Sequence, residues 1–455
     1  MEINKHIRTM KFPIRYIDRG KSPGKPRNEE KTPSGGKDEV SIGDGDTAPS
    51  QEMPPVKPQD IPGQSEQDAT APPSRNWTVL VYEAADNDLE KFMVQDVNDM
   101  ESIGSNTDLN IVVQMDRGKE PSELSGGWGG VRRLKLTKND DPYNIDSPVL
   151  QDLGQINMSA PENLSDFIQW GMKNFPANHY MLVMSDHGAG WKGGIEDKSH
   201  DDWMSMPRMR KGIEDAQKKT GKKLDVIGFD ACLMGQTEVA YELKDVADYM
   251  VASQEKEGAG GWPYHNILSK DILENIENAI KLKIKLEPDE MAKFIVHAAA
   301  KDQKNLPTMS AIDLSKMKSV GEATDKFAKA IIKTDTPGSL LKTLIRKTQN
   351  FEGFKDHYDF CKKIVMDDRV KDKNLKDSAQ EVMDRIYEAV ILEEHSEDYP
   401  GAQGLSVYLP SYRPSPPDDY LETRFARDTN WDEALTFIEN GPSQVSNQKP
   451  EKIDE

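Results

Sequence analysis

Short apolar runs alternate with stretches of helical periodicity through the middle of the chain. The apolar runs are rich in β-branched and aromatic residues, which is typical of buried strands. They span Trp77–Ala84, Leu109–Asp116, Tyr180–Asp186, Leu224–Phe229 and Tyr249–Ser253. The intervening segments have apolar residues every three or four positions and predict helices. These helices cover 86–104, Pro161–Phe175, a segment ending near Lys219, and Thr237–Leu243. The alternation predicts an α/β fold with a mostly parallel sheet and helices on both faces.

Beyond Tyr264 the pattern becomes mostly helical. The predicted helices are Asn266–Leu282, Pro288–Asp302, Lys316–Lys333, Asp356–Asp367 and Leu375–Glu394. Two strand-like runs interrupt them, Thr308–Leu314 and Gly404–Leu409, and the second is short enough to rejoin the sheet from outside the helical part. Earlier in the chain, the glycines of Gly126–Gly130 and the run Val131–Leu136 predict a hairpin outside the main sheet.

The two ends of the chain have a different composition from the rest. Residues 20–75 contain no Phe, Trp or Tyr and are rich in Pro, Gly, Ser and charge, so they cannot bury enough apolar surface to fold. We therefore divide the chain into a disordered N-terminal region (1–75), an α/β domain (76–265), a mostly helical part that completes the fold (266–440) and a disordered tail (441–455).

Charge and hydropathy exclude several classes of partner. The net charge of −20 argues against binding to nucleic acid or to anionic membranes. No run of 18 apolar residues exists in the 455-residue sequence, so no membrane span is predicted. The N-terminal residues are basic but lack an apolar segment, which predicts no signal peptide and favours the cytoplasm. The two cysteines, Cys232 and Cys361, give no disulfide framework, so either can be a free thiol.

A histidine and a cysteine follow two of the predicted strands. His187 comes directly after Tyr180–Asp186, and Cys232 comes two residues after Asp230 at the end of Leu224–Phe229. The carboxyl ends of parallel strands open onto one edge of a sheet, where α/β proteins place their ligands. A thiol beside an imidazole is the arrangement of a nucleophile and its base. A helix N-terminus after Cys232 would also lower the pKa of the thiol.

Each of these residues also has a less specific interpretation. His187 could be structural, Cys232 a buried core thiol, and Asp230 the N-cap of the next helix. The alternative for Asp230 is the anionic floor of a pocket that selects a cationic side chain. Cys361 lies on an amphipathic segment, where packing is its expected role.

Two motifs suggest other functions on a first comparison. Gly188-x-Gly190-x-x-Gly193 matches a dinucleotide fingerprint, but a polar loop rather than a helix is predicted after it. The acidic stretch 86–90 is similar to a calcium loop but lacks that loop's glycine and bidentate Glu. Capping of the following helix by Asn87 or Asp88 is therefore the better interpretation. Neither an H-E-x-x-H motif nor paired C-x-x-C motifs occur, so a zinc enzyme is not indicated.

The order and content of five motifs resemble the clostripain family of cysteine peptidases. The motifs are YEAADNDLE (82–90), SDHGAGW (185–191), DVIGFDACLMGQTEVAYEL (225–243), ASQEKEGAGGWPY (252–264) and GLSVYLP (404–410). The resemblance covers about 77–409. It implies a caspase-like α/β catalytic domain over 76–265, with a mostly parallel sheet flanked by helices and a largely helical C-terminal half. Members of this family are often exported.

The resemblance also implies roles for individual residues. His187 would be the general acid–base, Cys232 the nucleophile, and the backbone N–H groups of Gly188 and Cys232 the oxyanion hole. Asp230 matches the aspartate of the family's P1 pocket, which implies protein or peptide substrates cleaved after Arg or Lys. Self-cleavage between the histidine and cysteine motifs often activates such enzymes, and Lys198 is the favoured position here. No cofactor is expected, although some relatives depend on calcium.

One departure from the family pattern bears on specificity. Relatives commonly read G-D-G-W before the Pro-Tyr pair, where this chain has Gly260 in place of the acid. Basic specificity would then rest on Asp230, with help from Glu255 or Glu257. The rival functions are a catalytically silent scaffold of the same fold, a caspase-like peptidase with acidic preference, and a nucleotide-binding domain.

Overall fold

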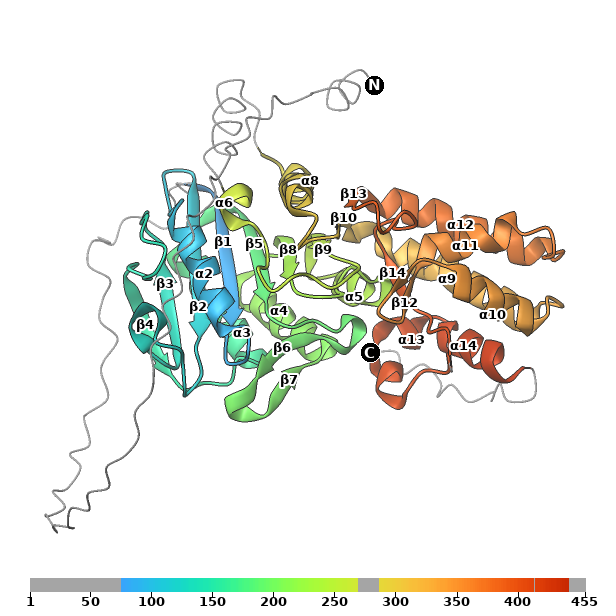
Figure 1. Cartoon of the computed structure of the whole chain (residues 1–455), viewed down its shortest axis with the longest axis horizontal. Coiled ribbons are helices and arrows are strands. Elements are labelled where there is room, and N and C mark those ends of the chain that lie inside the picture. Colours follow the sequence, from blue (N-terminus) through green and yellow to red (C-terminus); the bar gives the residue numbers. More distant parts are fainter. Residues whose placement is uncertain (1–74, 269–285, 413, 442–455) are drawn as a thin grey trace, which may run out of the picture. The chain divides into compact units, whose positions relative to one another are not determined.

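A nine-stranded sheet forms the centre of the computed structural model, which describes residues 75–268, 286–412 and 414–441. The strand order is β13-β10-β9-β8-β5-β1-β2-β3-β4 (Figure 1). The strands are β1 (Arg75–Ala84), β2 (Leu109–Asp116), β3 (Val131–Lys135), β4 (Val149–Gly154), β5 (Ala177–Ser185), β8 (Leu224–Asp230), β9 (Ala247–Ala252), β10 (Thr308–Asp313) and β13 (Val390–His395). The predicted N-terminal region and C-terminal tail lie outside the described residues, except Arg75 and Gly441.

The five central strands are parallel, as the alternating pattern predicts. β1 pairs with β2 and β5, β5 with β8, and β8 with β9, all in parallel. Register aligns the strand ends, since Ser185 at the end of β5 lies opposite Asp230 at the end of β8. The residues that follow these two strands therefore leave the sheet at the same edge.

The central strands are apolar on both faces because each face packs against helices. Leu80 and Tyr82 of β1 belong to one core, and Val79 and Val81 belong to a second core on the opposite face. The first core includes residues of α3 (Pro161–Asn174), α4 (Met206–Thr220), α5 (Thr237–Leu243) and α9 (Met317–Lys333). The second includes residues of α2 (Glu90–Glu101) and α8 (Pro288–Ala299). Each fully buried aliphatic side chain contributes roughly 1.5–3 kcal/mol, so the two cores together hold the strand ends in place.

The predicted hairpin outside the main sheet is wrong. β3 pairs antiparallel with β2, and β4 pairs antiparallel with β3, so this segment extends the sheet (Figure 1). Val131 and Leu134 are buried in opposite cores. Arg133, also buried, donates hydrogen bonds to Gln114 and Asp166. The edge of β2 gains a hydrogen-bonded partner in this way. The glycines that precede β3 suggested a separate hairpin instead.

Strands from the second half of the chain complete the other edge of the sheet. β10 pairs antiparallel with β9, and β13 pairs antiparallel with β10. The predicted helix Leu375–Glu394 is wrong at its end, because α12 (Lys373–Ala389) stops and Val390–His395 forms β13. The β-branched pair Val390-Ile391 marks this change. Because β10 and β13 both come from 266–440, they support the proposal that this part completes the fold of 76–265.

The C-terminal helices contain three elements that the pattern did not predict. The predicted ones are α8, α9, α11 (His357–Met366) and α12, and the additional ones are α10 (Gly338–Lys347), α13 (Arg424–Asp428) and α14 (Trp431–Asn440). The run Gly404–Leu409 contains β14 (Ser406–Tyr408), which pairs with β12 (Phe354–Asp356) in a separate three-stranded sheet rather than with the main sheet. The predicted helix Asn266–Leu282 lies mostly outside the described residues, after the short α6 (Tyr264–Ile267). Within the described ranges, no helix is long and apolar enough to cross a membrane.

Candidate active site

The segments after β5 and β8 meet at the carboxyl edge of the sheet. Asp186 N–H donates to the Asp230 carbonyl at 3.2 Å, which continues the β5–β8 pairing beyond the strands. A Cβ placed on Gly188 would lie 2.3 Å from the Cys232 carbonyl oxygen and 3.0 Å from its amide nitrogen. The backbone next to His187 therefore lies directly against the backbone of Cys232, and only glycine fits at position 188.

Gly188→Ala should lower kcat by about 10²-fold or more, because the methyl group must push apart the two backbone segments that would bind the oxyanion. Gly338→Ala is the matched control: its Cβ would lie no closer than 3.8 Å to another residue, at the start of α10, and the change should leave activity unchanged. Steady-state kinetics on both variants, with circular dichroism to confirm folding, measures the difference. Full activity in Gly188→Ala would remove this segment from the reacting centre.

Cys232 lies in a tight turn, and the thiol is partly buried. The thiol donates a weak hydrogen bond to the Glu257 carbonyl at 3.7 Å. The next residue, Leu233, has a φ of 67°, which is strained for a leucine. Two backbone hydrogen bonds hold this turn: Leu233 N–H donates to Glu255 O, and Gly235 N–H donates to Ser253 O.

The predicted effect of a helix N-terminus on this thiol is wrong. α5 begins only at Thr237, after the turn, and burial raises the pKa of Cys232, with a smaller opposing effect from its hydrogen bond to Glu257. Burial therefore disfavours the thiolate, and the use of Cys232 as a nucleophile requires a base.

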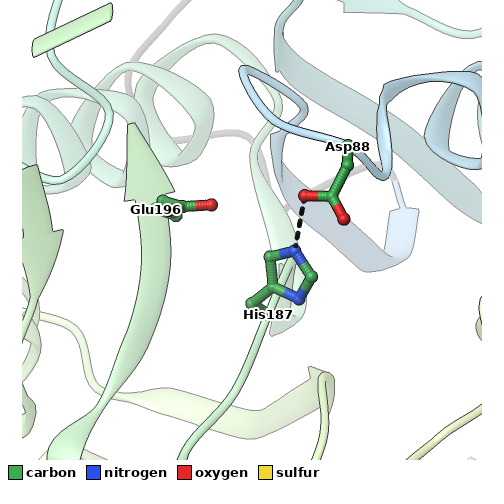
Figure 2. Close-up of side chains that lie close together, drawn as sticks. All are labelled: Asp88, His187 and Glu196. Carbon is green, nitrogen blue, oxygen red and sulfur yellow. Dashed lines mark hydrogen bonds and ion pairs between the residues drawn. The ribbon is translucent and has the colours of Figure 1, made fainter. Parts of the chain in front are cut away.

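His187 is partly exposed and contacts a carboxylate from another strand end. Its Nε2 lies 3.2 Å from Asp88 Oδ1, and Asp88 also accepts a hydrogen bond from Lys198 Nζ at 2.9 Å. Figure 2 shows the other ring nitrogen of His187 on the side away from Asp88, and the Glu196 side chain directed toward the His187–Asp88 contact. The pKa of Asp88 is lowered, first by the Lys198 hydrogen bond and then by that of His187.

Asp88 is a site residue that sequence reasoning did not identify. It lies four residues past the end of β1, which neighbours β5, so the sheet brings it to the edge where His187 lies. The predicted N-cap, Asn87 or Asp88, is wrong: α2 begins at Glu90 after Leu89 with no side-chain cap, and Asn87 Oδ1 accepts the Leu89 N–H at 2.9 Å in the turn before the helix. The signal that could have found Asp88 is its position after a predicted parallel strand.

Asp88→Asn should lower kcat by about 2- to 5-fold with little change in KM, the range expected when an exposed pair only orients its partner. An asparagine keeps the shape but loses the charge that pairs with Nε2 of His187. Glu196→Gln is the control, because no hydrogen bond joins it to His187 among the described residues. An equal loss in both variants would mean that local charge, and not the His187 contact, matters.

Asp230 is buried beneath a loop that returns from β9. Its carboxylate accepts hydrogen bonds from Trp262 N–H at 3.0 Å and from the Tyr264 hydroxyl at 2.9 Å. Burial raises the pKa of Asp230 to about 6, and the Tyr264 hydrogen bond is the largest opposing effect. Asp230 does not cap α5, whose N-cap is Gln236. Asp230 is therefore a buried acid held by two hydrogen bonds from this loop.

Lys198 lies at the end of a two-stranded hairpin, where the sequence predicted an irregular loop. β6 (Gly194–Asp197) and β7 (Asp202–Met204) pair antiparallel, and Lys198 begins the turn between them. Lys198 N–H donates to the Asp86 carbonyl at 3.2 Å, and Ser199 N–H donates to Asp86 Oδ2 at 2.8 Å. The Gly188–Gly193 motif contains a short 3₁₀ turn and is followed directly by β6, so it lacks the helix that a dinucleotide site needs.

Two groups of side chains have ligand atoms within 4.8 Å of one another in the described part of the chain. One is Asp88, His187 and Glu196, and the other is Asp86, Asp116 and Asp197. The second group offers carboxylate oxygens, the donors that calcium takes. It fits calcium by donor type, and burial raises the pKa of Asp116 to about 7. A calcium ion bound there would neutralise the negative charge of these carboxylates and connect the ends of β1 and β2 to the β6–β7 hairpin.

The chain is similar in sequence to known peptidases. The sequence model of the clostripain family matches residues 81–439. Clostripain from Hathewaya histolytica is 25% identical over 400 residues, covering 73% of this chain and 74% of that protein.

Two similar structures share the fold. A secreted C11 cysteine protease from Bacteroides thetaiotaomicron, in complex with an irreversible peptide inhibitor, has a TM-score of 0.58 and 19% identity, covering 78% of this chain and 99% of that one. An inactive zymogen C11 protease from Parabacteroides distasonis has a TM-score of 0.57 and 21% identity, covering 79% and 99%. They confirm the caspase-like α/β fold that the motifs predicted. Because the family match spans most of the described residues, this chain belongs to the clostripain family and is a cysteine peptidase.

Proposed function

We propose that this protein is an endopeptidase that cleaves after Arg or Lys, with Cys232 as nucleophile and His187 as the group that carries the proton. The observation that carries the proposal is the contact of Gly188 with the backbone of Cys232, which places the histidine and cysteine segments side by side above Asp230.

The reaction proceeds in two steps. His187 accepts the proton of the Cys232 thiol as the sulfur attacks the scissile carbonyl, and the N–H groups of Gly188 and Cys232 bind the oxyanion that forms. The C–N bond breaks as His187 returns the proton to the leaving amine, which leaves a thioester on Cys232. Water then attacks the thioester with His187 as base, and the free acid and the Cys232 thiol are released.

Asp230 supplies the specificity in this proposal. A buried carboxylate near the nucleophile favours a P1 side chain that ends in a cation, through a charge-assisted hydrogen bond. The same charge disfavours an acidic P1 residue, which argues against the caspase-like acidic preference. The family contains a zymogen, and self-cleavage after Lys198 is the activation step that we propose here.

Hydrolysis of matched fluorogenic peptides with Arg, Lys or Asp at P1 tests the proposal. The full chain and a chain nicked after Lys198 are compared, each with and without calcium. We expect cleavage after Arg and Lys and none after Asp. Cleavage after Asp alone would contradict the assigned pocket, and a nicked, folded chain that cleaves none of the three would favour a binding protein over a peptidase.

A further inference from the structure

The loop that covers Asp230 contains a second carboxylate that the proposed function does not use. Both carboxylate oxygens of Glu257 are buried, and neither accepts a well-formed hydrogen bond from the described residues. The groups that face them are the Asp230 carboxyl and the Trp262 indole, whose N–H also lacks a well-formed partner. Burial raises the pKa of Glu257, and the neighbouring Asp230 raises it further.

The position of Glu257 is fixed by the loop. Glu257 O accepts the Cys232 thiol hydrogen bond, and Gly258 N–H donates to Asn305 O at 2.7 Å. Gly261, with φ of 52°, brings the chain so close to Asp230 that a Cβ there would lie 3.0 Å from both of its oxygens. The loop therefore holds the Glu257 side chain between the thiol and the acid below it.

The remaining charged groups near the pair are acidic, with one exception at the surface. The charge of Asp230 acts on Glu83 of β1 and on Asp96 of α2, and the Tyr264 hydroxyl donates to Asp230. Lys256 acts on Cys232, but its side chain is about half exposed and pairs with Glu352. The described residues thus supply no buried cation to the pair.

We propose that Glu257 is the second acid of the P1 pocket, and that Asp230 and Glu257 share one proton until the cation of an Arg or Lys side chain replaces it. This deepens the proposed function and rests on it. Two facing carboxylates cannot both be ionised cheaply without a proton or a cation between them. A guanidinium bound between the two carboxylates would take the place of the shared proton. One proton would therefore leave the pocket for each substrate side chain that enters.

Glycine at position 260 agrees with this assignment. A Cβ on Gly260 would lie 3.5 Å from the Asn305 side chain, in ordinary contact, and Asp230 is not among its near neighbours. Glu255, the other acid considered from the sequence, accepts a hydrogen bond from Lys256 N–H and interacts with Tyr399. Of the nearby loop acids, Glu257 is the one whose carboxyl group faces Asp230.

Proton exchange gives the pocket a characteristic pH dependence. Burial raises the pKa of Asp230 to about 6, so protons compete with the substrate cation increasingly below that pH. KM for an Arg substrate should therefore rise as pH falls from 7 to 5. KM for the citrulline analogue, which has the same shape without the charge, should change much less.

The test compares Glu257→Gln with the control Glu255→Gln on Arg and citrulline peptides between pH 5 and 8. Glu257→Gln should raise KM for Arg by about 30-fold, since a buried charge partner is lost, with kcat and the citrulline kinetics unchanged. The variant should also show a smaller increase in KM as pH falls, because the amide of the glutamine can donate to Asp230 without a shared proton. A purely structural role for Glu257 would instead lower kcat for both peptides.

Binding of benzamidine gives a readout that needs no catalysis. Calorimetry in buffers of different ionisation enthalpy should show about one proton released per benzamidine bound near pH 6 in the wild type, and none in Glu257→Gln. Unchanged Arg kinetics and proton release in Glu257→Gln would overturn the inference while leaving the proposed function standing. Failure of the wild type to bind benzamidine or to prefer Arg would overturn the basic P1 pocket itself.

Discussion

Replacing Cys232 by alanine should lower peptide hydrolysis by at least about 10³-fold, because no other thiol lies at this edge of the sheet and covalent catalysis is lost. The fold should persist, since the thiol is partly buried and makes one weak hydrogen bond. Hydrolysis of an Arg peptide is measured by fluorescence, and the thermal midpoint by circular dichroism.

Cys361→Ala is the matched control for thiol loss. Cys361 is fully buried in α11, as expected of a packing residue, and its pKa is raised well above the usual value by burial. Its removal should cost about 1–2 kcal/mol of stability through the small cavity that it leaves, while activity at 25 °C stays near that of the wild type. Hydrolysis that survives in Cys232→Ala would contradict the assigned nucleophile.

Replacing Asp230 by asparagine should lower the preference for Arg over citrulline at P1 by about 10²- to 10³-fold, because the buried charge that faces the P1 cation is lost. Asparagine has the same shape and keeps one oxygen for Trp262 N–H, while its NH₂ group would face the Tyr264 hydroxyl, which can accept a hydrogen bond instead of donating one. The ratio of kcat/KM values for the two peptides measures the loss. An unchanged ratio would place the P1 pocket elsewhere.

The same variant has a second, independent signature in stability. The folded pKa of Asp230, about 6, lies above its unfolded value near 3.8, so the buried carboxyl destabilises the fold as pH rises through this interval. Asp230→Asn removes that cost. The difference in thermal midpoint, variant minus wild type, should therefore be more positive at pH 8 than at pH 4. A difference that does not depend on pH would mean that Asp230 is not protonated more readily in the folded state.

The sequence predicted the parts of the site that follow directly from strand ends. His187 and Cys232 come after apolar runs whose length and composition indicate strands. Parallel strands end at the same edge of a sheet, so the two residues are expected there. Asp88 belongs to the same edge by the same logic. Its acidic surroundings matched helix capping equally well, and nothing in a local pattern separates the two roles.

Other features depend on contacts between distant segments and could not be predicted. β3 joins the sheet because β2 offers an open edge, and β13 follows a helix because β10 lies beside it. Neither partner is visible from the periodicity of the segment itself. The burial of Cys232 similarly reflects the loop that packs over it from β9, and this burial reverses the pKa shift that a helix N-terminus would have caused.

The hairpin that carries Lys198 has a kinetic consequence. A peptidase binds its substrate in an extended form, yet both residues of the bond Lys198–Ser199 donate their N–H groups to Asp86, and the Lys198 side chain is paired with Asp88. Cleavage at this bond therefore requires local opening of the hairpin first. For the self-cleavage that we propose after Lys198, amide hydrogen exchange at Ser199 would measure the rate of this opening, and that rate would set an upper limit on how fast the chain becomes active.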